Sequence, residues 1–212
     1  MTLVSPNTLT DSRNLQKHTN ANPLHRWLLG RFHQTLATLV EAVLAERRTD
    51  DAAQVLEVGC GEGFVTNYLS KRFSSARFTG LEVRREALSF AKKSGERANW
   101  LQGDAFQLPF RDHSVPVVVC AEVLEHLPDA QAALAEMRRV CSGTLILSVP
   151  NQPFFSMANF LRGKNLSTLG EDPEHVHHWR ASTFVRMVQR VAPVREVRYA
   201  FPWVIAVSDV RS

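Results

Sequence analysis

The stretch that decides the fold is residues 54–63, QVLEVGCGEG. Its first half, Gln54–Val58, is a short apolar run typical of a buried strand. Three glycines follow at alternate positions, Gly59, Gly61 and Gly63. Glycine permits positive φ angles and lets a ligand approach the backbone closely, and a following helix adds free N–H groups and a partial positive charge. The segment therefore predicts a strand, a ligand-binding turn and a helix.

The ligand expected at this turn is not a dinucleotide. The glycines form G-x-G-x-G, whereas the dinucleotide fingerprint has G-x-G-x-x-G. Glu57 also places a carboxylate near the end of the strand, where it would repel a pyrophosphate but attract an ammonium group. A plain strand–turn–helix junction without a ligand remains the alternative for this motif alone.

On both sides of this stretch, short apolar segments alternate with amphipathic ones. Strands are expected at Gln54–Val58, Arg77–Leu81, Trp100–Leu101, Val115–Cys120, Thr144–Val149, Val194–Tyr199 and Val204–Val210. Helices are expected at residues 24–47, with Asn22 as N-cap and Pro23 at the first position, and at Phe64–Phe73, Arg84–Ser94, Ala130–Val140 and Thr183–Val191. The alternation predicts parallel β–α–β units, and hence an α/β fold with a doubly wound, mostly parallel seven-stranded sheet and helices on both faces.

The chain divides into three parts of one domain. Residues 1–50 are expected to form an N-terminal segment, loosely ordered as far as residue 21, and a cap helix. Residues 51–149 form the ligand-binding core, and residues 150–212 form a lid segment with the closing helix and strands. Residues 150–180 show no clear period, and a loop of that length predicts a functional lid or an inserted piece.

Two further acidic residues follow expected strands. Glu82 ends the second strand, where a carboxylate can accept both hydrogen bonds of a ribose diol, and Val83 beside it can pack on an adenine face. Asp104 follows the third strand and can accept from an adenine amine, while Ala105 supplies an N–H group. The alternative for Asp104 is that it caps a turn.

Residues 120–129, CAEVLEHLPD, follow the fourth strand at the sheet edge where open α/β folds bind ligands. In a short helix, Glu122, Glu125 and His126 would lie on one face. Carboxylates with an imidazole serve as a general base or as metal ligands. In the alternative, His126 caps and packs while the glutamates face solvent.

Taken together, these motifs resemble the class I S-adenosylmethionine-dependent methyltransferases, most closely the type 11 methyltransferase-domain family, whose fold is Rossmann-like. The resemblance covers residues 54–149 and rests on the order and spacing of the motifs. Two departures, Pro116 and the Cys141–Gly143 turn expected before the fifth strand, concern local turn geometry. The resemblance implies S-adenosylmethionine as cofactor, its methionine part at Glu57, Gly59, Cys60, Gly61 and Gly63, its ribose at Glu82, its adenine at Val83, Asp104 and Ala105, and its sulfonium beside Ala121 and Glu122.

The implied reaction is direct in-line transfer of a methyl group from the sulfonium to an oxygen, nitrogen or carbon nucleophile. The donor is intrinsically activated, so the protein mainly supplies alignment and a dry pocket. A general base is needed only when the nucleophile must lose a proton, and the catalytic candidates are His126, then His175 and His178. The last two belong to the run EHVHHW at residues 174–179 of the expected lid; in the alternative they cap the next helix.

No metal is expected, because the Glu-x-x-Glu-His string at residues 122–126 is common in type 11 proteins. The same string with a later histidine resembles the metal site of small-RNA 2′-O-methyltransferases. A metal-dependent RNA 3′-end 2′-O-methyltransferase is therefore one alternative function. A non-catalytic S-adenosylmethionine-binding partner subunit is another.

Composition and charge limit the classes of partner that can be expected. The 212 residues carry a net charge of +4, with an excess of three positive charges in residues 1–35 and again in 160–200. This pattern leaves two interpretations open, an ordinary solvated surface and a cap that attracts an anionic acceptor. One domain without a separate recognition module suits a small or lipid-linked acceptor, and nucleic acid is not expected. The three cysteines, Cys60, Cys120 and Cys141, are an odd number in apolar or glycine-rich contexts, which indicates buried reduced thiols. We expect a cytoplasmic protein, since no signal peptide and no apolar run long enough to span a membrane is evident.

Overall fold

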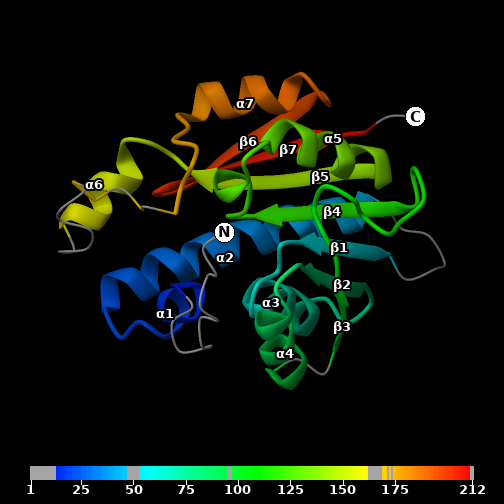
Figure 1. Cartoon of the computed structure of the whole chain (residues 1–212), viewed down its shortest axis with the longest axis horizontal. Helices are drawn as coiled ribbons and strands as arrows, with labels where there is room; N and C mark the ends of the chain where they lie inside the picture. The colour runs from blue at the N-terminus through cyan, green and yellow to red at the C-terminus, as the bar shows by residue number, and fades with distance from the viewer. Residues whose placement is uncertain are drawn as a thin grey trace, which may run out of the picture.

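The computed structural model describes residues 13–46, 53–94, 97–161, 169–170, 172 and 174–210. A seven-stranded sheet with the order β3-β2-β1-β4-β5-β7-β6 forms its centre (Figure 1). Its strands are β1 Gln54–Val58, β2 Arg77–Glu82, β3 Ala98–Gln102, β4 Val115–Ala121, β5 Cys141–Pro150, β6 Val194–Ala200 and β7 Trp203–Asp209. The predicted α/β sheet is confirmed, and five of its strands run parallel while β7 and β6 pair antiparallel at one edge.

Helices cover both faces of the sheet. They are α1 Arg13–Thr19, α2 Pro23–Glu46, α3 Phe64–Arg72, α4 Arg85–Ser94, α5 Ala130–Val140, α6 Phe154–Leu161 and α7 Ala181–Gln189, with a 3₁₀ turn, η2, at Leu124–His126. One core cluster joins the sheet to α2 and α3, and the other joins it to α5 and α7. The predicted start of α2 is confirmed, because Asn22 Oδ1 accepts a hydrogen bond of 3.2 Å from the His25 N–H.

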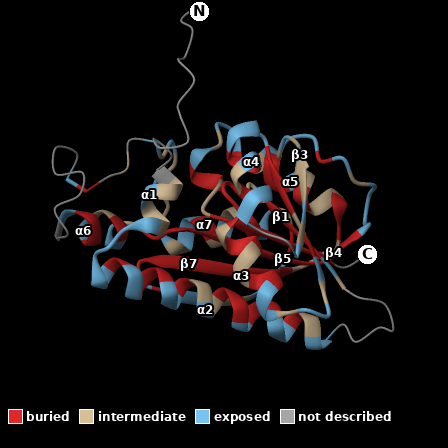
Figure 2. Ribbon diagram, turned by 90° about the horizontal axis from the view of Figure 1, so that it is seen from below, coloured by how far each residue is buried: buried red, intermediate tan, exposed pale blue. Residues whose placement is uncertain are grey.

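The central strands are buried from both faces. Val117, Val118 and Val119 of β4 belong alternately to the two core clusters and are fully buried. Runs of consecutive β-branched residues are typical of a parallel strand covered on both sides. Figure 2 shows these buried strands lying inside the exposed outer faces of the helices. All three cysteines are buried and free, as the sequence indicates.

Three local predictions were wrong. Residues 13–19, expected to be loose, form α1, and the expected irregular stretch after residue 150 contains α6. Cys141–Gly143, expected as a turn, lies inside β5 because that strand pairs with both β4 and β7. Arg162 and Lys164, which contribute to the positive charge expected in residues 160–200, lie outside the described residues.

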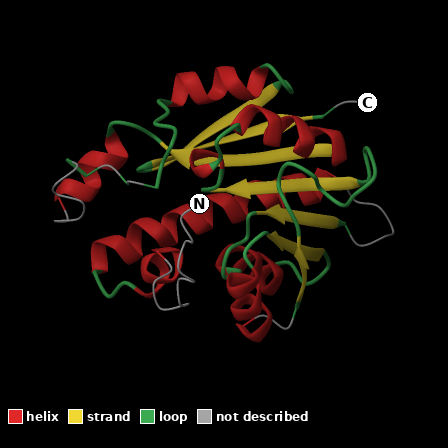
Figure 3. Cartoon of the chain, in the orientation of Figure 1, coloured by secondary structure: helices red, strands yellow, loops and turns green. Residues whose placement is uncertain are grey.

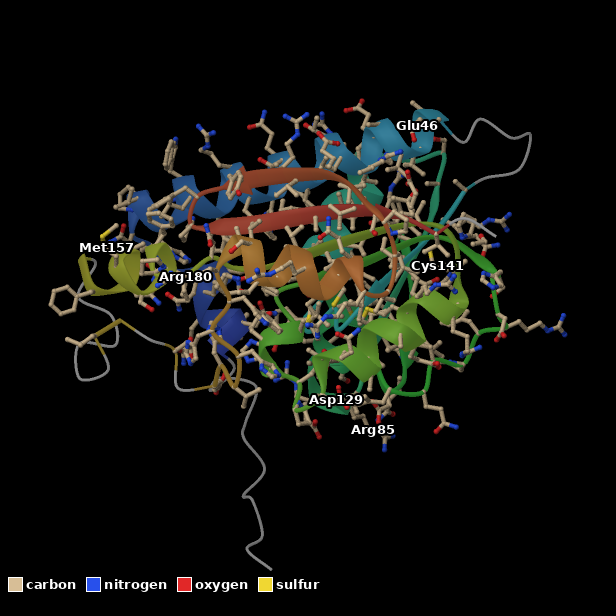
Figure 4. All side chains as sticks on the ribbon, turned by 90° about the horizontal axis from the view of Figure 1, so that it is seen from above. Glu46, Arg85, Asp129, Cys141, Met157 and Arg180 are labelled. Atoms are coloured by element: carbon tan, nitrogen blue, oxygen red, sulfur yellow. The ribbon has the colours of Figure 1, made fainter. Side chains whose placement is uncertain are left out.

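The carboxyl ends of the parallel strands point toward α1 and α6 (Figure 3). Figure 4 shows the same polarity, with Met157 of α6 at the opposite end of the molecule from Glu46 and Cys141. The loops after β1, β2, β3 and β4 therefore lie at the same end of the sheet, near α1 (Figure 1). Within the described ranges, no helix combines the length and apolar character needed to cross a bilayer.

Candidate active site

A cavity of about 730 Å³ opens at this end of the sheet. We call one part the glycine-loop half; it is lined by Glu57, Gly59, Cys60, Gly61, Glu82, Val83, Arg84, Asp104 and Ala105. We call the other the histidine half; it is lined by Lys17, Leu29, Phe32, Glu122, Glu125, His126, Phe155, His175 and Trp203. Ala121 at the end of β4 also lines the cavity. Most residues that the sequence analysis selected therefore meet in one space.

The glycine loop is tied to the end of β2. The N–H groups of Gly59 and Cys60 both donate to the Leu81 carbonyl, at 2.8 and 3.0 Å. The Gly61 N–H donates to Glu82 Oε2 at 2.9 Å. Gly61 has a φ of +53°, and a Cβ there would lie 2.7 Å from Asn14 Nδ2 of α1. The positive φ favours glycine at this position, whereas the Asn14 amide is the end of a flexible side chain and could move aside.

Gly63 has a different role from the other two glycines. It does not line the cavity. Its φ is +79°, and a Cβ would lie 2.4 Å from the Trp100 ring and 2.9 Å from the Ala91 Cβ. Gly63 precedes α3 and lets that helix start close to β3 and α4. Its position therefore indicates packing of the turn, in contrast to the expected ligand contact.

Two buried carboxylates stand on either side of the loop. Glu57 accepts a hydrogen bond from the Thr66 hydroxyl, and burial raises the pKa of Glu57 to about 7. Glu82 Oε1 accepts from the Arg84 N–H at 2.9 Å and from Arg84 Nε at 3.2 Å. Both carboxylates keep lone pairs for further donors, because a carboxylate offers about four acceptor positions.

The loop after β3 completes the glycine-loop half. Asp104 Oδ1 accepts from the Phe106 N–H at 2.9 Å, so this residue does cap a turn while it also lines the cavity. Val83, which directly follows β2, also lines the cavity and is 59% exposed. An apolar side chain and an acidic one at the cavity wall suit a planar base with an exocyclic amine.

Glu122 lies outside the short helix that the sequence predicts. It has a φ of +61°, and only Leu124–His126 forms a 3₁₀ turn. The prediction that Glu122, Glu125 and His126 share one face of a helix was therefore wrong, although all three residues line the cavity. The loop brings them together because the Glu122 N–H is held by the Ser148 carbonyl of β5 at 3.2 Å.

Helix α1 and strand β7 supply partners of Glu122 that the sequence analysis missed. Lys17 Nζ lies 3.3 Å from Glu122 Oε2, and the Trp203 indole N–H donates to the same oxygen. Lys17 Nζ also lies 5.2 Å from the centre of the Trp203 ring. Burial raises the pKa of Glu122, and the Lys17 charge opposes that rise. No periodic signal in residues 13–19 indicated this contact.

The three candidate histidines are not equivalent. His126 Nδ1 donates to the Glu174 carbonyl at 3.1 Å, and the ring lies 4.9 Å from that of His175. Burial, with the nearby His126, lowers the pKa of His175 to about 4. His178 is exposed and outside the cavity lining, with its ring 6.3 Å from that of His175.

Comparison with known proteins agrees with the fold. Residues 56–147 match the family model described as a methyltransferase domain. The magnesium protoporphyrin IX methyltransferase from Synechocystis PCC 6803, solved with S-adenosylhomocysteine bound, has a TM-score of 0.69 to this chain and 16% identity, covering 94% of this chain and 92% of the other. At that identity, the likeness shows the fold alone.

Two curated relatives are methyltransferases by name. Fatty-acid O-methyltransferase from Mycolicibacterium smegmatis is 30% identical over 122 residues, which is 57% of this chain and 41% of the relative. Phthiotriol/phenolphthiotriol dimycocerosates methyltransferase from Mycobacterium tuberculosis is 37% identical over 89 residues, 41% of this chain and 33% of the relative. The matched region spans less than half of either relative.

The fold and the motifs define a class I S-adenosylmethionine-dependent methyltransferase domain. Residues 56–147 match the type 11 methyltransferase domain, and these matches indicate S-adenosylmethionine as the cofactor.

Proposed function

We propose that the protein transfers a methyl group from S-adenosylmethionine to an oxygen, nitrogen or carbon nucleophile of a small or lipid-linked acceptor. The observation that carries this proposal is the continuity of the cavity. One space of about 730 Å³ joins the glycine-loop half to the histidine half, with Ala121 and Glu122 where the two meet. In-line transfer needs donor and acceptor in one water-poor space, aligned across the reacting carbon.

The glycine-loop half is proposed to bind the cofactor. The Glu57 carboxylate attracts the methionine ammonium, and the backbone of Gly59–Gly61 leaves room for the chain. Glu82 accepts from the ribose diol, and Val83, Asp104 and Ala105 surround the adenine. This assignment directs the sulfonium toward Ala121 and Glu122, and hence toward the histidine half.

A lipid-linked acceptor is favoured by the apolar character of the histidine half and its surroundings. Leu29, Phe32 and Phe155 line the cavity. Helix α6 is mostly apolar, and its Phe154, Met157 and Phe160 side chains are 44 to 48% exposed. Exposed clusters of large apolar side chains mark ligand or membrane contacts. The names of the two curated relatives, which refer to a fatty acid and to phthiotriol lipids, support the same acceptor class.

Positive charge beside this region favours an acidic head group. Arg26 and Arg31 are exposed on α2, and the Arg31 guanidinium lies 5.2 Å from the Trp27 ring. Trp27 itself is 56% exposed. A basic and aromatic helix end next to an apolar cavity suits an acceptor with an acidic head and an apolar tail.

His126 is the first candidate for a general base. Its Nδ1 is engaged by the Glu174 carbonyl, which leaves Nε2 as an acceptor within the cavity. His175 is the second candidate. His178 is exposed and lies outside the lining, so we propose no role for it in the transfer.

The proposal is tested by incubating the purified protein with S-adenosylmethionine carrying a deuterated methyl group, in separate reactions with long-chain fatty acids and with phenolic lipids. Mass spectrometry should find the labelled methyl on the lipid and an equal amount of S-adenosylhomocysteine. A labelled product only on RNA would instead favour the RNA methyltransferase alternative. Cofactor binding without transfer to either class of acceptor would favour the non-catalytic alternative.

A further inference from the structure

We propose that Glu125, His126 and His175 bind a divalent transition-metal ion in the histidine half of the cavity. Each of these residues offers one ligand atom, and the three atoms lie within 4.8 Å of one another. All three residues line the cavity. One carboxylate oxygen and two imidazole nitrogens form a mixed donor set that suits zinc or manganese better than magnesium.

Glu125 is the residue that most requires a partner. It is 1% exposed, and neither of its carboxylate oxygens has a hydrogen-bond partner among the described residues. Its backbone carbonyl is engaged, since it accepts hydrogen bonds from the N–H groups of Val176 and His177 at 2.9 and 3.2 Å. Burying a charged group is costly unless it is paired, and a bound cation supplies that pairing.

Each of the two histidines has a ring nitrogen available to bind a metal ion. A carbonyl oxygen only accepts, so the bond from His126 to the Glu174 carbonyl fixes the proton on Nδ1 and leaves the Nε2 lone pair free. A hydrogen bond of this kind from the second ring nitrogen orients most metal-binding histidines. His175 Nδ1 is also buried without a partner among the described residues.

Glu122 lies at the border of this set and is not counted in it. Its Oε2 is held by Lys17 and Trp203, whereas its Oε1 is buried and has no partner within the described part of the chain. Three protein ligands leave at least one coordination position open toward the cavity, as in catalytic metal sites. The open position would take an oxygen of the acceptor.

The catalytic role of the ion rests on the proposed function. The binding of the ion does not depend on that function. A cation bound to an acceptor hydroxyl lowers the pKa of that group and holds its oxygen toward the sulfonium. The oxygen forms the new bond to the methyl carbon as the carbon–sulfur bond breaks. S-adenosylhomocysteine leaves, and the hydroxyl proton passes to water at the cavity mouth. In this proposal His126 Nε2 is a metal ligand and no longer serves as the general base, and the proposal departs from the expectation of a metal-free site.

Binding is tested on the whole chain after treatment with a chelator and removal of the chelator. Titration with zinc chloride alone, followed by calorimetry and elemental analysis, should give one equivalent of bound zinc, with manganese weaker and magnesium weakest. Glu125→Gln and His175→Gln should each weaken zinc binding by more than about tenfold. His178→Gln is the matched control, because that ring lies outside the cavity lining, and it should bind zinc like the unchanged protein.

Affinity for S-adenosylhomocysteine, measured on every variant, verifies that the fold and the glycine-loop half are intact. Absence of stoichiometric zinc in the unchanged protein would overturn the metal proposal, as would equal losses in His178→Gln and His175→Gln. Methyl transfer that continues in excess chelator would overturn the catalytic role and leave the proposed function standing. Zinc binding without methyl transfer to any lipid would support the site and count against the proposed function.

Discussion

Glu57 and Glu82 in the glycine-loop half each accept hydrogen bonds from nearby donors, whereas both carboxylate oxygens of Glu125 in the histidine half have no partner among the described residues. The first pair is held by groups that follow β1 and β2, namely Thr66 of α3 and the N–H groups of Gly61 and Arg84. Glu125 lies close to His126 and to the distant His175, but neither donates a hydrogen bond to it. The difference separates a half whose carboxylates are already paired from a half in which the proposed metal ion would supply the pairing.

The largest effect is expected from Gly61→Val in the glycine-loop half. The new side chain would meet Asn14 and would be strained at a φ of +53°, so binding of S-adenosylhomocysteine should fall below detection by calorimetry. Gly30→Ala is the control, because a Cβ there meets nothing within 4 Å. It should leave binding unchanged and stabilise α2 by up to about 1 kcal/mol. Undiminished binding in Gly61→Val would remove the loop from the cofactor site.

Glu82→Ala should weaken cofactor binding by about tenfold to a hundredfold, since each hydrogen bond to a charged group is worth about 1.5–3 kcal/mol. The loss has two sources, the ribose contact and the bond that holds the Gly61 N–H. Glu41→Ala, on the exposed face of α2, is the control and should bind normally. An unchanged dissociation constant for Glu82→Ala would move the ribose elsewhere.

The pH dependence of cofactor binding tests Glu57. Burial raises the pKa of this carboxyl to about 7 in the free protein, and the cofactor ammonium favours its ionised form. Binding therefore releases a proton, and affinity should fall by up to about tenfold for each pH unit below 7. Calorimetry in buffers of different ionisation enthalpy counts that proton. Glu57→Gln should bind more weakly with no such slope, and a slope that persists in this variant would assign the proton to another group.

The smallest effect is expected from Lys17→Gln in the histidine half. Lys17 is partly exposed and pairs with Glu122, so its removal should lower methyl transfer by about fivefold, the size typical of a partly exposed ion pair. Affinity for S-adenosylhomocysteine should remain within about twofold of the unchanged value. Equal losses in transfer and in cofactor affinity would show that the two halves are not separate in function.

The same comparison explains what could be predicted from the sequence. Glu57, Glu82 and Asp104 were predicted to lie together because each is at or just beyond the carboxyl end of a parallel strand, and these ends converge by topology alone. Helix α1 was missed because contacts distant in sequence support it: Asn14 donates to Glu62, and the His18 ring stacks 4.0 Å from that of Phe64. A seven-residue helix has little stability of its own, so its sequence carries a weak signal.

The sequence did not predict helix α6 or the contact made by Trp203 of β7, for a different reason in each case. Helix α6 has only eight residues, six of them apolar, so no clear helical period stands out in residues 154–161. Trp203 begins β7 one residue before the expected strand, and only the pairing of β7 with β5 directs its indole to Glu122. Register between distant strands depends on tertiary pairing, which a single sequence does not display.

The most direct test of the central claim is a crystal structure with S-adenosylhomocysteine bound. The account predicts the amino group beside Glu57, the ribose at Glu82, the adenine between Val83 and Asp104, and the sulfur facing Glu122 and the histidine half. S-adenosylhomocysteine bound with its sulfur directed away from Glu125, His126 and His175, or absent from the cavity at saturating concentration, would contradict it.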